Sequence, residues 1–348
     1  MPEGRAEGSA AAAVSERAQA SPRPGEGAAG EGAAGAGRVP EFFIIGHEKC
    51  GTTALYKMLR RHPQVFMPDF KEPRFFSSDI RASAPRPGGA KPQTLEAYMA
   101  LFAQARPDQL AGEASPQYIR SPRAAAAIAQ VRPDARIIAI LREPASFLRS
   151  YHQQCVQSTL ETERDLRRAL ELEPERRQGR HLPPGSESPA WLLYSENVRY
   201  VEQLRRYHTA FGPERVLVLI YDDYRRDNVE TLRRVLRFLE VDETLALEPI
   251  ETRRETHTAV RFMPLHRISR KLRMAKHKPE NAGAFARTVS RATPRPVQMA
   301  WRRIVYSRPA PADAELMLEL RSRFKPEVVA LSEYLGRDLV ALWGYDDI

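Results

Sequence analysis

Residues 42–59 decide the fold, and they read FFIIGHEKCGTTALYKML. The run Phe42–Ile45 is wholly apolar and is stopped by Gly46, a pattern typical of a β-strand that is buried on both faces. From Thr53 to Arg61 the apolar side chains recur at helical spacing. The stretch therefore predicts a buried strand, a short loop that contains two glycines, and then a helix.

Two later segments repeat this plan of a strand followed by a helix. Residues 136–141 (RIIAIL) and 216–221 (VLVLIY) are short apolar runs that predict buried strands. Pro144 suits the first turn of a helix after the first run, and Asp227 with Glu230 forms a capping-box-like start after the second. Repeated strand–helix units predict an α/β fold with a parallel sheet and helices on both faces.

Other regions differ from this core in composition. Residues 1–38 are almost entirely Ala, Gly, Ser, Pro, Glu and Arg, which cannot bury enough apolar surface to offset the entropy of ordering. We expect a disordered tail over 1–38 and a single domain over 39–348. The polar stretch 160–190 predicts a helical insertion and loop. Near the C-terminus, the apolar spacing over 316–324 predicts a helix, and Pro326 is expected to start another.

The bulk properties limit the class of protein. No segment approaches the roughly 18 consecutive apolar residues of a membrane span, and the N-terminus lacks the pattern of a secretory signal, so we expect a cytoplasmic protein. The 54 Lys and Arg exceed the 44 Asp and Glu, giving a net charge of +10 that favours anionic partners. A solvated arginine-rich surface is the alternative. Cys50 and Cys155 give no metal-ligand spacing and no disulfide framework.

The loop between Gly46 and Thr53 lies where a buried strand meets a helix. At such a junction, backbone N–H groups and the positive end of the helix dipole converge on an anion. Gly46 and Gly51 have the spacing of the phosphate loop of nucleotide triphosphatases, but that motif places a lysine where Thr52 stands here. The lysine lies inside the loop instead, at Lys49. A glycine-containing turn without chemistry is the alternative.

The pattern FFIIGxxKxGTTALxxxL resembles the 5′-phosphosulfate loop of sulfotransferases that use 3′-phosphoadenosine 5′-phosphosulfate (PAPS), in the branch of bacterial and heparan sulfate sulfotransferases. The resemblance implies PAPS as cosubstrate and a P-loop-type three-layer sandwich, with a central parallel sheet flanked by helices. It implies that Lys49 stabilises charge on the departing phosphate. The backbone at Cys50, Gly51 and Thr52, with the hydroxyls of Thr52 and Thr53, would cradle that phosphate. Cys50 departs from the small residue usual there, where the expected contact is backbone.

A second strand–helix junction, residues 141–151 (LREPASFLRSY), resembles the 3′-phosphate signature of the same family. An arginine leaves the strand end and a serine follows eight positions later on the helix. A phosphate monoester accepts hydrogen bonds from a forked guanidinium and a hydroxyl, so Arg142 and Ser150 are predicted to bind the cofactor. The alternative for Arg142 is a salt bridge at the helix start, with Glu143 or Glu113.

Transfer to a hydroxyl or amine requires a base that removes a proton. Residues 71–76 (KEPRFF) resemble the segment in which heparan-type members of the family carry their catalytic glutamate, which makes Glu72 the candidate general base. Pro73 is expected to hold Glu72 in an extended backbone, and Lys71 to tune its pKa or contact an acidic substrate. An exposed loop glutamate is the alternative, and His47 is a weaker rival base.

The family resemblance is looser elsewhere. Residues 113–118 (EASPQY) resemble a segment at the acceptor cleft, and residues 200–207 resemble a helix with a packing role. The basic stretch 253–273 lies where a late loop closes over the nucleotide in relatives, and Arg261 is a guess within it.

We therefore predict a sulfotransferase that moves the sulfuryl group of PAPS to a hydroxyl or amine of a carbohydrate or glycan-like acceptor. Glu72 takes the acceptor proton, the acceptor attacks sulfur in line, and Lys49 neutralises the leaving oxygen. No metal and no nucleic acid is expected to take part. One alternative is a nucleotide kinase or NTPase with an atypical loop and a Mg²⁺ ligand at Asp222 or Asp223. Another is a non-enzymatic binder of acidic glycan or nucleic acid.

Overall fold

The computed structural model describes residues 37–80, 91–184, 188–245, 259–267, 303–307 and 311–348. The expected tail, apart from its last two residues, and most of the basic region 253–310 lie outside these residues. A five-stranded parallel sheet with strand order β2-β3-β1-β4-β5 forms the centre of the fold. The strands are β1 Phe42–Gly46, β2 Val65–Phe66, β3 Leu110–Ala114, β4 Arg136–Leu141 and β5 Val216–Ile220.

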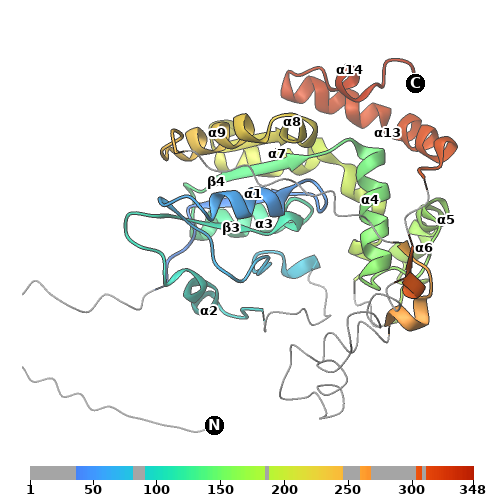
Figure 1. The fold of residues 1–348 in the computed structure, drawn as a ribbon, viewed down its shortest axis with the longest axis horizontal. Coiled ribbons are helices and arrows are strands. Elements are labelled where there is room, and N and C mark those ends of the chain that lie inside the picture. The colour runs from blue at the N-terminus through green and yellow to red at the C-terminus, as the bar shows by residue number, and fades with distance from the viewer. Residues whose placement is uncertain (1–36, 81–90, 185–187, 246–258, 268–302, 308–310) are drawn as a thin grey trace, which may run out of the picture. The chain divides into compact units, whose positions relative to one another are not determined.

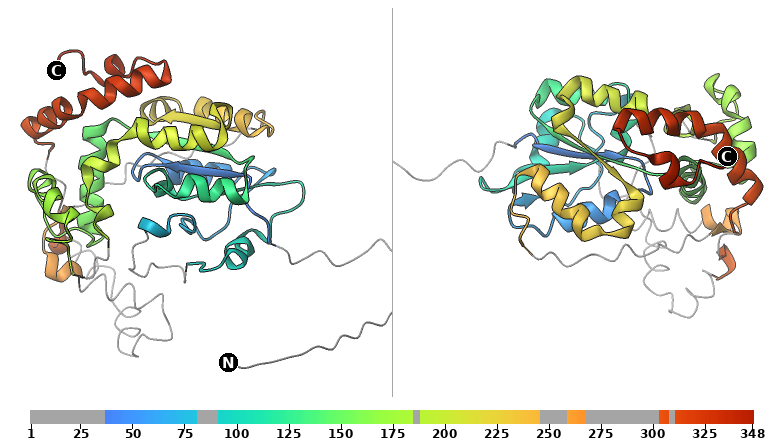
Figure 2. Two further views of the ribbon diagram at one scale, coloured as in Figure 1. Left: turned by 180° about the vertical axis from the view of Figure 1, so that it is seen from behind. Right: turned by 90° about the horizontal axis from the view of Figure 1, so that it is seen from above.

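Helices cover both faces of this sheet (Figure 1, Figure 2). Helices α1 Thr52–Leu59 and α9 Asn228–Leu239 lie on one face, and α3 Ala124–Val131 and α7 Tyr200–Phe211 on the other, as the right-hand view of Figure 2 shows. The long helix α13 Ala314–Leu335 packs on α7 and on α4 Pro144–Gln157. This is the expected three-layer α/β sandwich, and that prediction is confirmed. No described helix has the length and apolar composition needed to cross a membrane.

Shorter elements complete the fold: α2 Leu95–Met99, α5 Leu166–Glu171, α6 Glu173–Arg177, α8 Tyr221–Arg226, α14 Leu339–Trp343, the 3-10 turns η1 Ser78–Ile80, η2 Ala100–Phe102, η3 Pro116–Ile119, η4 Pro189–Trp191, η5 Tyr194–Val198 and η6 Pro213–Arg215, and the antiparallel pair β6 Ala259–Val260 and β7 Tyr306–Ser307. Helices α5 and α6 confirm the predicted helical insertion.

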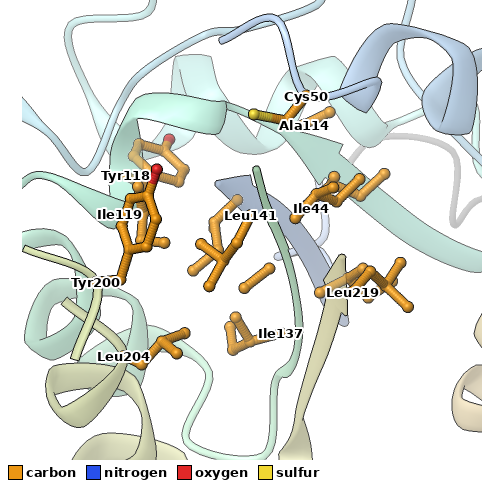
Figure 3. Packing of buried hydrophobic residues seen from close by; sticks show 14 of the residues in the cluster. Ile44, Cys50, Ala114, Tyr118, Ile119, Ile137, Leu141, Tyr200, Leu204 and Leu219 are labelled. Carbon is orange, nitrogen blue, oxygen red and sulfur yellow. The ribbon is translucent and has the colours of Figure 1, made fainter. Parts of the chain in front are cut away.

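The sheet places the chemistry-bearing loops together. In β1, Phe42 pairs with Arg136 and Gly46 with Ile140, so β1 and β4 end at the same level. Apolar side chains from β1, β4 and β5 pack with those of α7 in one buried cluster (Figure 3). Because all five strands are parallel, the segments that follow β1, β3 and β4 emerge at one edge of the sheet, where ligands bind in open α/β sheets.

Two details differ from the expectations. Tyr221 begins α8 instead of ending the third predicted strand. Pro326 lies inside α13, which runs without a break to Leu335. A proline inside a helix removes one backbone hydrogen bond. Here Phe324 and Val328 are buried on either side of it, so packing against the core outweighs that loss.

Candidate active site

The loop between β1 and α1 depends on both of its glycines. Gly46 has a φ of 129°, and a Cβ built there would lie 2.4 Å from the carbonyl oxygen of Ile140 in β4. Gly51 has a φ of 89°, and its Cβ would lie 2.9 Å from a ring carbon of Tyr224. Between them Lys49 is also left-handed, with a φ of 70°. The glycines thus allow a backbone conformation and a close approach that other residues would oppose.

The N-terminus of α1 opens into this loop. The N–H groups of Ala54 and Leu55 both donate to the carbonyl oxygen of Gly51, at 2.9 and 3.1 Å. Within the part of the chain that the structure describes, the backbone amides from Cys50 to Thr53 have no hydrogen-bond acceptor. Unpaired N–H groups and the positive end of a helix dipole form an anion-binding site. Lys49 is half-buried beside it and Thr53 is exposed.

The side chains of Cys50 and His47 point into the protein. Cys50 is fully buried, and burial raises the pKa of its thiol to about 12, so the thiol is neutral and only its backbone can serve a ligand. His47 is also fully buried, with Nε2 3.1 Å from the side-chain oxygen of Gln203. Burial lowers the pKa of His47 to about 3. This placement removes His47 as a rival base.

Arg142 follows β4 and lies against the loop. Its guanidinium donates to the carbonyl oxygen of Lys49 at 3.2 Å and lies 5.0 Å from the centre of the Tyr221 ring. Tyr200 Oη donates to the carbonyl oxygen of Arg142 at 2.9 Å, which fixes the strand end. The guanidinium is half-buried and belongs to the same edge of the sheet as the anion-binding amides.

The salt-bridge alternative for Arg142 is not supported, because both candidate partners have other roles. Glu143 caps α4 by accepting from the N–H groups of Ala145 and Ser146, at 3.1 and 2.6 Å. Glu113 accepts two tyrosine hydroxyls. Over the described ranges, no ion pair joins Arg142 to either glutamate.

Ser150 lies on the second turn of α4 and is 5% exposed. Its hydroxyl has no hydrogen-bond partner among the residues that the structure places. Leaving a buried hydroxyl unpaired costs about 1–3 kcal/mol, so such groups in proteins are normally paired with a neighbour, a water or a ligand. An unpaired donor at this position fits an anion oxygen.

The segment after β2 carries Glu72, whose carboxylate accepts from Lys71 Nζ at 3.0 Å and from the Arg74 guanidinium at 2.7 Å. The expectation of an extended backbone at Glu72 is wrong, since its φ is 60° and that of Arg74 is 57°. Contacts distant in sequence override the local preference: the Arg74 N–H donates to Ser115 Oγ at 3.1 Å. The Glu72 side chain is 20% exposed, so it is neither a freely solvated loop residue nor a core residue.

A continuous chain of contacts joins Glu72 to the loop between β1 and α1. Arg74, paired with Glu72, lies 4.9 Å from the Trp191 ring, and Arg120 lies 4.7 Å from the same ring. Arg120 then pairs with Glu48 in the loop at 2.7 Å, and both side chains are only 6% exposed. Arg120, Trp191 and Glu48 are residues that the sequence did not single out, because no local motif connects positions so far apart.

A cavity of about 380 Å³ lies beside this chain of contacts. Trp191 and Arg120 form part of its wall, and the rest comes from η1, η4, η5, α7 and the residues beside them. Three acidic side chains and three arginines line the cavity: Asp79, Glu196, Glu202, Arg120, Arg199 and Arg206. Neither sign of charge therefore dominates.

The acids offered as Mg²⁺ ligands under the NTPase alternative are engaged elsewhere. Asp222 accepts from the indole N–H of Trp343 at 2.9 Å, and Asp223 from the Arg337 guanidinium at 2.9 Å. They hold the C-terminal helix α14 and the turn before it. Arg261, the guess within the basic region, is exposed, and its N–H donates to the carbonyl oxygen of Val305 at 2.8 Å.

These features define an α/β fold with unpaired backbone amides and a half-buried arginine at the carboxyl edge of its parallel sheet. Residues 40–244 match the model of the sulfotransferase family, and the chain belongs to this family. The predicted family and the prediction of an enzyme are thereby confirmed.

The solved structure of a sulfotransferase from Alicyclobacillus acidocaldarius is similar, with a TM-score of 0.61 and 27% identity over 87% of this chain and 98% of that one. The membrane-associated sulfotransferase kil1 of Dictyostelium discoideum is 33% identical over 33% of this chain and 23% of its own length. The human bifunctional heparan sulfate N-deacetylase/N-sulfotransferase 3 is 26% identical over 59% of this chain and 22% of its own length. The chain thus matches less than a quarter of each of these two relatives.

Glu113, at the end of β3, provides a test of site electrostatics. It is fully buried, and burial raises the pKa of its carboxyl from 4.5 to about 7. The folded protein therefore binds this proton more tightly than the unfolded chain does. The free energy of unfolding that this proton contributes is fully present below pH 4.5 and is lost as the pH rises through 7. We expect the unfolding free energy of wild type to fall relative to Glu113→Gln by about 2 kcal/mol from pH 5 to pH 8, measured by urea unfolding.

The exposed variant Glu333→Gln is the control for this experiment, and it should follow wild type over the same pH range. A difference between wild type and Glu113→Gln that stays constant from pH 5 to pH 8 would contradict the assignment of Glu113 as the titrating group.

Proposed function

We propose that this sulfotransferase moves the sulfuryl group of PAPS to a hydroxyl or amine of a carbohydrate or glycan-like acceptor. The observation that carries the proposal is that unpaired hydrogen-bond donors follow both β1 and β4 at one edge of the sheet. The unpaired amides of Cys50–Thr53 would form one anion site, and Arg142 with the unpaired hydroxyl of Ser150 would form the other. A donor with phosphate at both the 5′ and 3′ positions requires two such sites.

The residues present fit this donor. The amides of Cys50, Gly51 and Thr52 and the hydroxyls of Thr52 and Thr53 would hold the 5′-phosphosulfate. Lys49 would neutralise the charge that develops on the leaving phosphate oxygen. Arg142 and Ser150 would hold the 3′-phosphate, by a forked guanidinium and a hydroxyl.

Glu72 would remove the acceptor proton. Its neighbours Lys71 and Arg74 donate to its two carboxylate oxygens, at 3.0 and 2.7 Å, and so orient the carboxylate. The carbohydrate part of the proposal is supported by a relative whose name gives heparan sulfate as its substrate.

The donor assignment predicts which nucleotides bind. Arg142→Ala should weaken the binding of 3′,5′-bisphosphoadenosine by about 30-fold, because one charged hydrogen-bonding group is worth about 2 kcal/mol. Binding of 5′-AMP, which lacks the 3′-phosphate, should change little. Ser150→Ala should weaken only the bisphosphate, by about 5-fold. Calorimetry without Mg²⁺ measures all of these affinities.

Arg233→Ala, an exposed arginine on α9, is the control and should bind both nucleotides as wild type does. Equal losses for the two nucleotides in Arg142→Ala would contradict a 3′-phosphate site. Stabilisation by Mg-ATP without any response to the bisphosphate would favour the NTPase alternative.

The acceptor is tested by incubation with radiolabelled PAPS and a panel of desulfated heparin, heparosan, a neutral oligosaccharide and p-nitrophenol. We expect label on at least one carbohydrate. Label on p-nitrophenol alone would contradict the carbohydrate assignment while leaving sulfuryl transfer in place.

A further inference from the structure

Glu113 is a buried carboxylate that takes no direct part in the proposed reaction. It lies in β3, directly beside the central strand β1, and is fully buried. Tyr98 Oη of α2 and Tyr118 Oη of η3 donate to the same carboxylate oxygen, Oε2, at 2.6 and 3.0 Å. Helix α2 and turn η3 are therefore both hydrogen-bonded to the same carboxylate.

Tyr118 connects this carboxylate to the segment of Glu72. A phenol has one hydrogen to donate, and Tyr118 gives it to Glu113. Its oxygen then accepts from the N–H of Phe76 at 3.3 Å. Tyr98 makes no such bond to the 72–76 backbone in the described part of the chain, although it donates to the same oxygen of Glu113.

The segment held in this way has an unfavourable backbone. Glu72 and Arg74 are both left-handed on either side of Pro73, and non-glycine residues adopt that region at a cost in free energy. Such a conformation persists only when surrounding contacts determine it. The contacts that do so here include the N–H of Arg74 to Ser115 Oγ and the N–H of Phe76 to Tyr118.

We propose that Glu113 is a positioning residue for sulfuryl transfer, which acts through Tyr118 to hold residues 72–76 in the conformation that presents the Glu72 carboxylate. This inference rests on the proposed function, in which Glu72 is the general base. Glu113 itself touches neither substrate in this scheme. Its effect on catalysis must pass through Glu72, and that requirement separates it from a residue that only stabilises the fold.

The two tyrosines form a matched pair for the test. Tyr118→Phe and Tyr98→Phe each remove one hydroxyl from Glu113, but only Tyr118→Phe removes the acceptor for the Phe76 N–H. We expect Tyr118→Phe to lower kcat about 10-fold, since small misplacements of catalytic groups are costly. Its KM for PAPS should be unchanged. Tyr98→Phe should stay within about 2-fold of wild type. The assay uses the panel carbohydrate that wild type sulfates fastest.

Two substitutions of Glu113 test whether its role is to accept hydrogen bonds. Glu113→Leu removes the acceptor for both phenols and should lose kcat as Tyr118→Phe does. Glu113→Gln keeps a carbonyl oxygen that can accept them and should retain most of the activity. Amide hydrogen exchange gives a readout that needs no acceptor: the amides of Arg74 and Phe76 should lose protection in Tyr118→Phe and Glu113→Leu, and keep it in Tyr98→Phe.

The outcomes separate this inference from the proposed function. In a Glu72→Gln background, Tyr118→Phe should cause no further loss of kcat, because its effect passes through Glu72. An inactive Glu72→Gln beside a Tyr118→Phe with wild-type kcat and protected amides would overturn the positioning role alone. Equal losses in the two tyrosine variants would also overturn it. A fully active Glu72→Gln would overturn the base assignment and, with it, the positioning role.

Discussion

Lys49→Ala should lower kcat for sulfuryl transfer by about 10³-fold or more, because a preorganised charge at the leaving oxygen acts in a partly dry site. The loop should survive the change. Lys49 already has a Cβ at a left-handed φ of 70°, so alanine adds no new backbone strain. The contact from Arg142 is to the backbone carbonyl of residue 49 and does not depend on the side chain.

The measurement compares single-turnover rates from radiolabelled PAPS with the binding of 3′,5′-bisphosphoadenosine. That nucleotide lacks only the sulfuryl group and keeps the former bridging oxygen in its 5′-phosphate, so its binding reports what Lys49 contributes without the transfer step. Its affinity should fall by about 30-fold, far less than the rate. Lys57→Ala is the control, since Lys57 is an exposed lysine on the helix that follows the loop. Near wild-type turnover in Lys49→Ala would overturn the proposed mechanism.

Glu72→Gln should lower kcat by about 10²–10⁴-fold, the usual contribution of a well-placed general base. Glutamine is nearly the same size and keeps one oxygen that can accept from Lys71 or Arg74, so the segment should keep its shape. It cannot take a proton from the acceptor. The KM for PAPS should remain close to that of wild type, because Glu72 has no contact with the donor in the proposed scheme.

The control for this second prediction is Glu230→Gln, an exposed glutamate in the first turn of α9, which should leave kcat unchanged. Loss of nucleotide affinity in Glu72→Gln in parallel with kcat would indicate that the segment had collapsed onto the donor site. Retained kcat would contradict the role of Glu72 directly.

The sequence predicted the parts of the fold that carry a strong local signal. The strands β1, β4 and β5 are apolar runs flanked by turn or capping residues, and the helix after Asp227 begins at a side-chain cap, with Asp227 accepting from the Glu230 N–H at 2.9 Å. Strands β2 and β3 gave no such signal. β2 has two residues, and β3 reads LAGEA, which is poor in residues that favour strands. Its Gly112 is needed because a Cβ there would lie 2.0 Å from the Phe42 ring.

The candidate site also has parts that a local sequence motif predicts and parts that only the tertiary fold reveals. The loop between β1 and α1, Arg142 and Ser150 follow from motifs at two strand–helix junctions, and the structure brings these junctions together. The left-handed backbone at Glu72 could not be predicted, since Ser115 and Tyr118 impose it from another part of the chain. The same holds for the link from Arg74 through Trp191 to Arg120. Its members lie far apart in sequence and meet only through the tertiary fold.

The close fit of Gly46 against Ile140 has a consequence for how the protein folds. The two residues are about ninety positions apart, and the His47 N–H also donates to the carbonyl oxygen of Ile140 at 3.3 Å. The loop between β1 and α1 therefore cannot adopt its folded conformation until β4 has left the ribosome, although all of the loop's own residues are synthesised long before. Such non-local pairing slows folding. We expect nascent chains that end before residue 136 to show no nucleotide-dependent protection from proteolysis, and the full-length chain to show it.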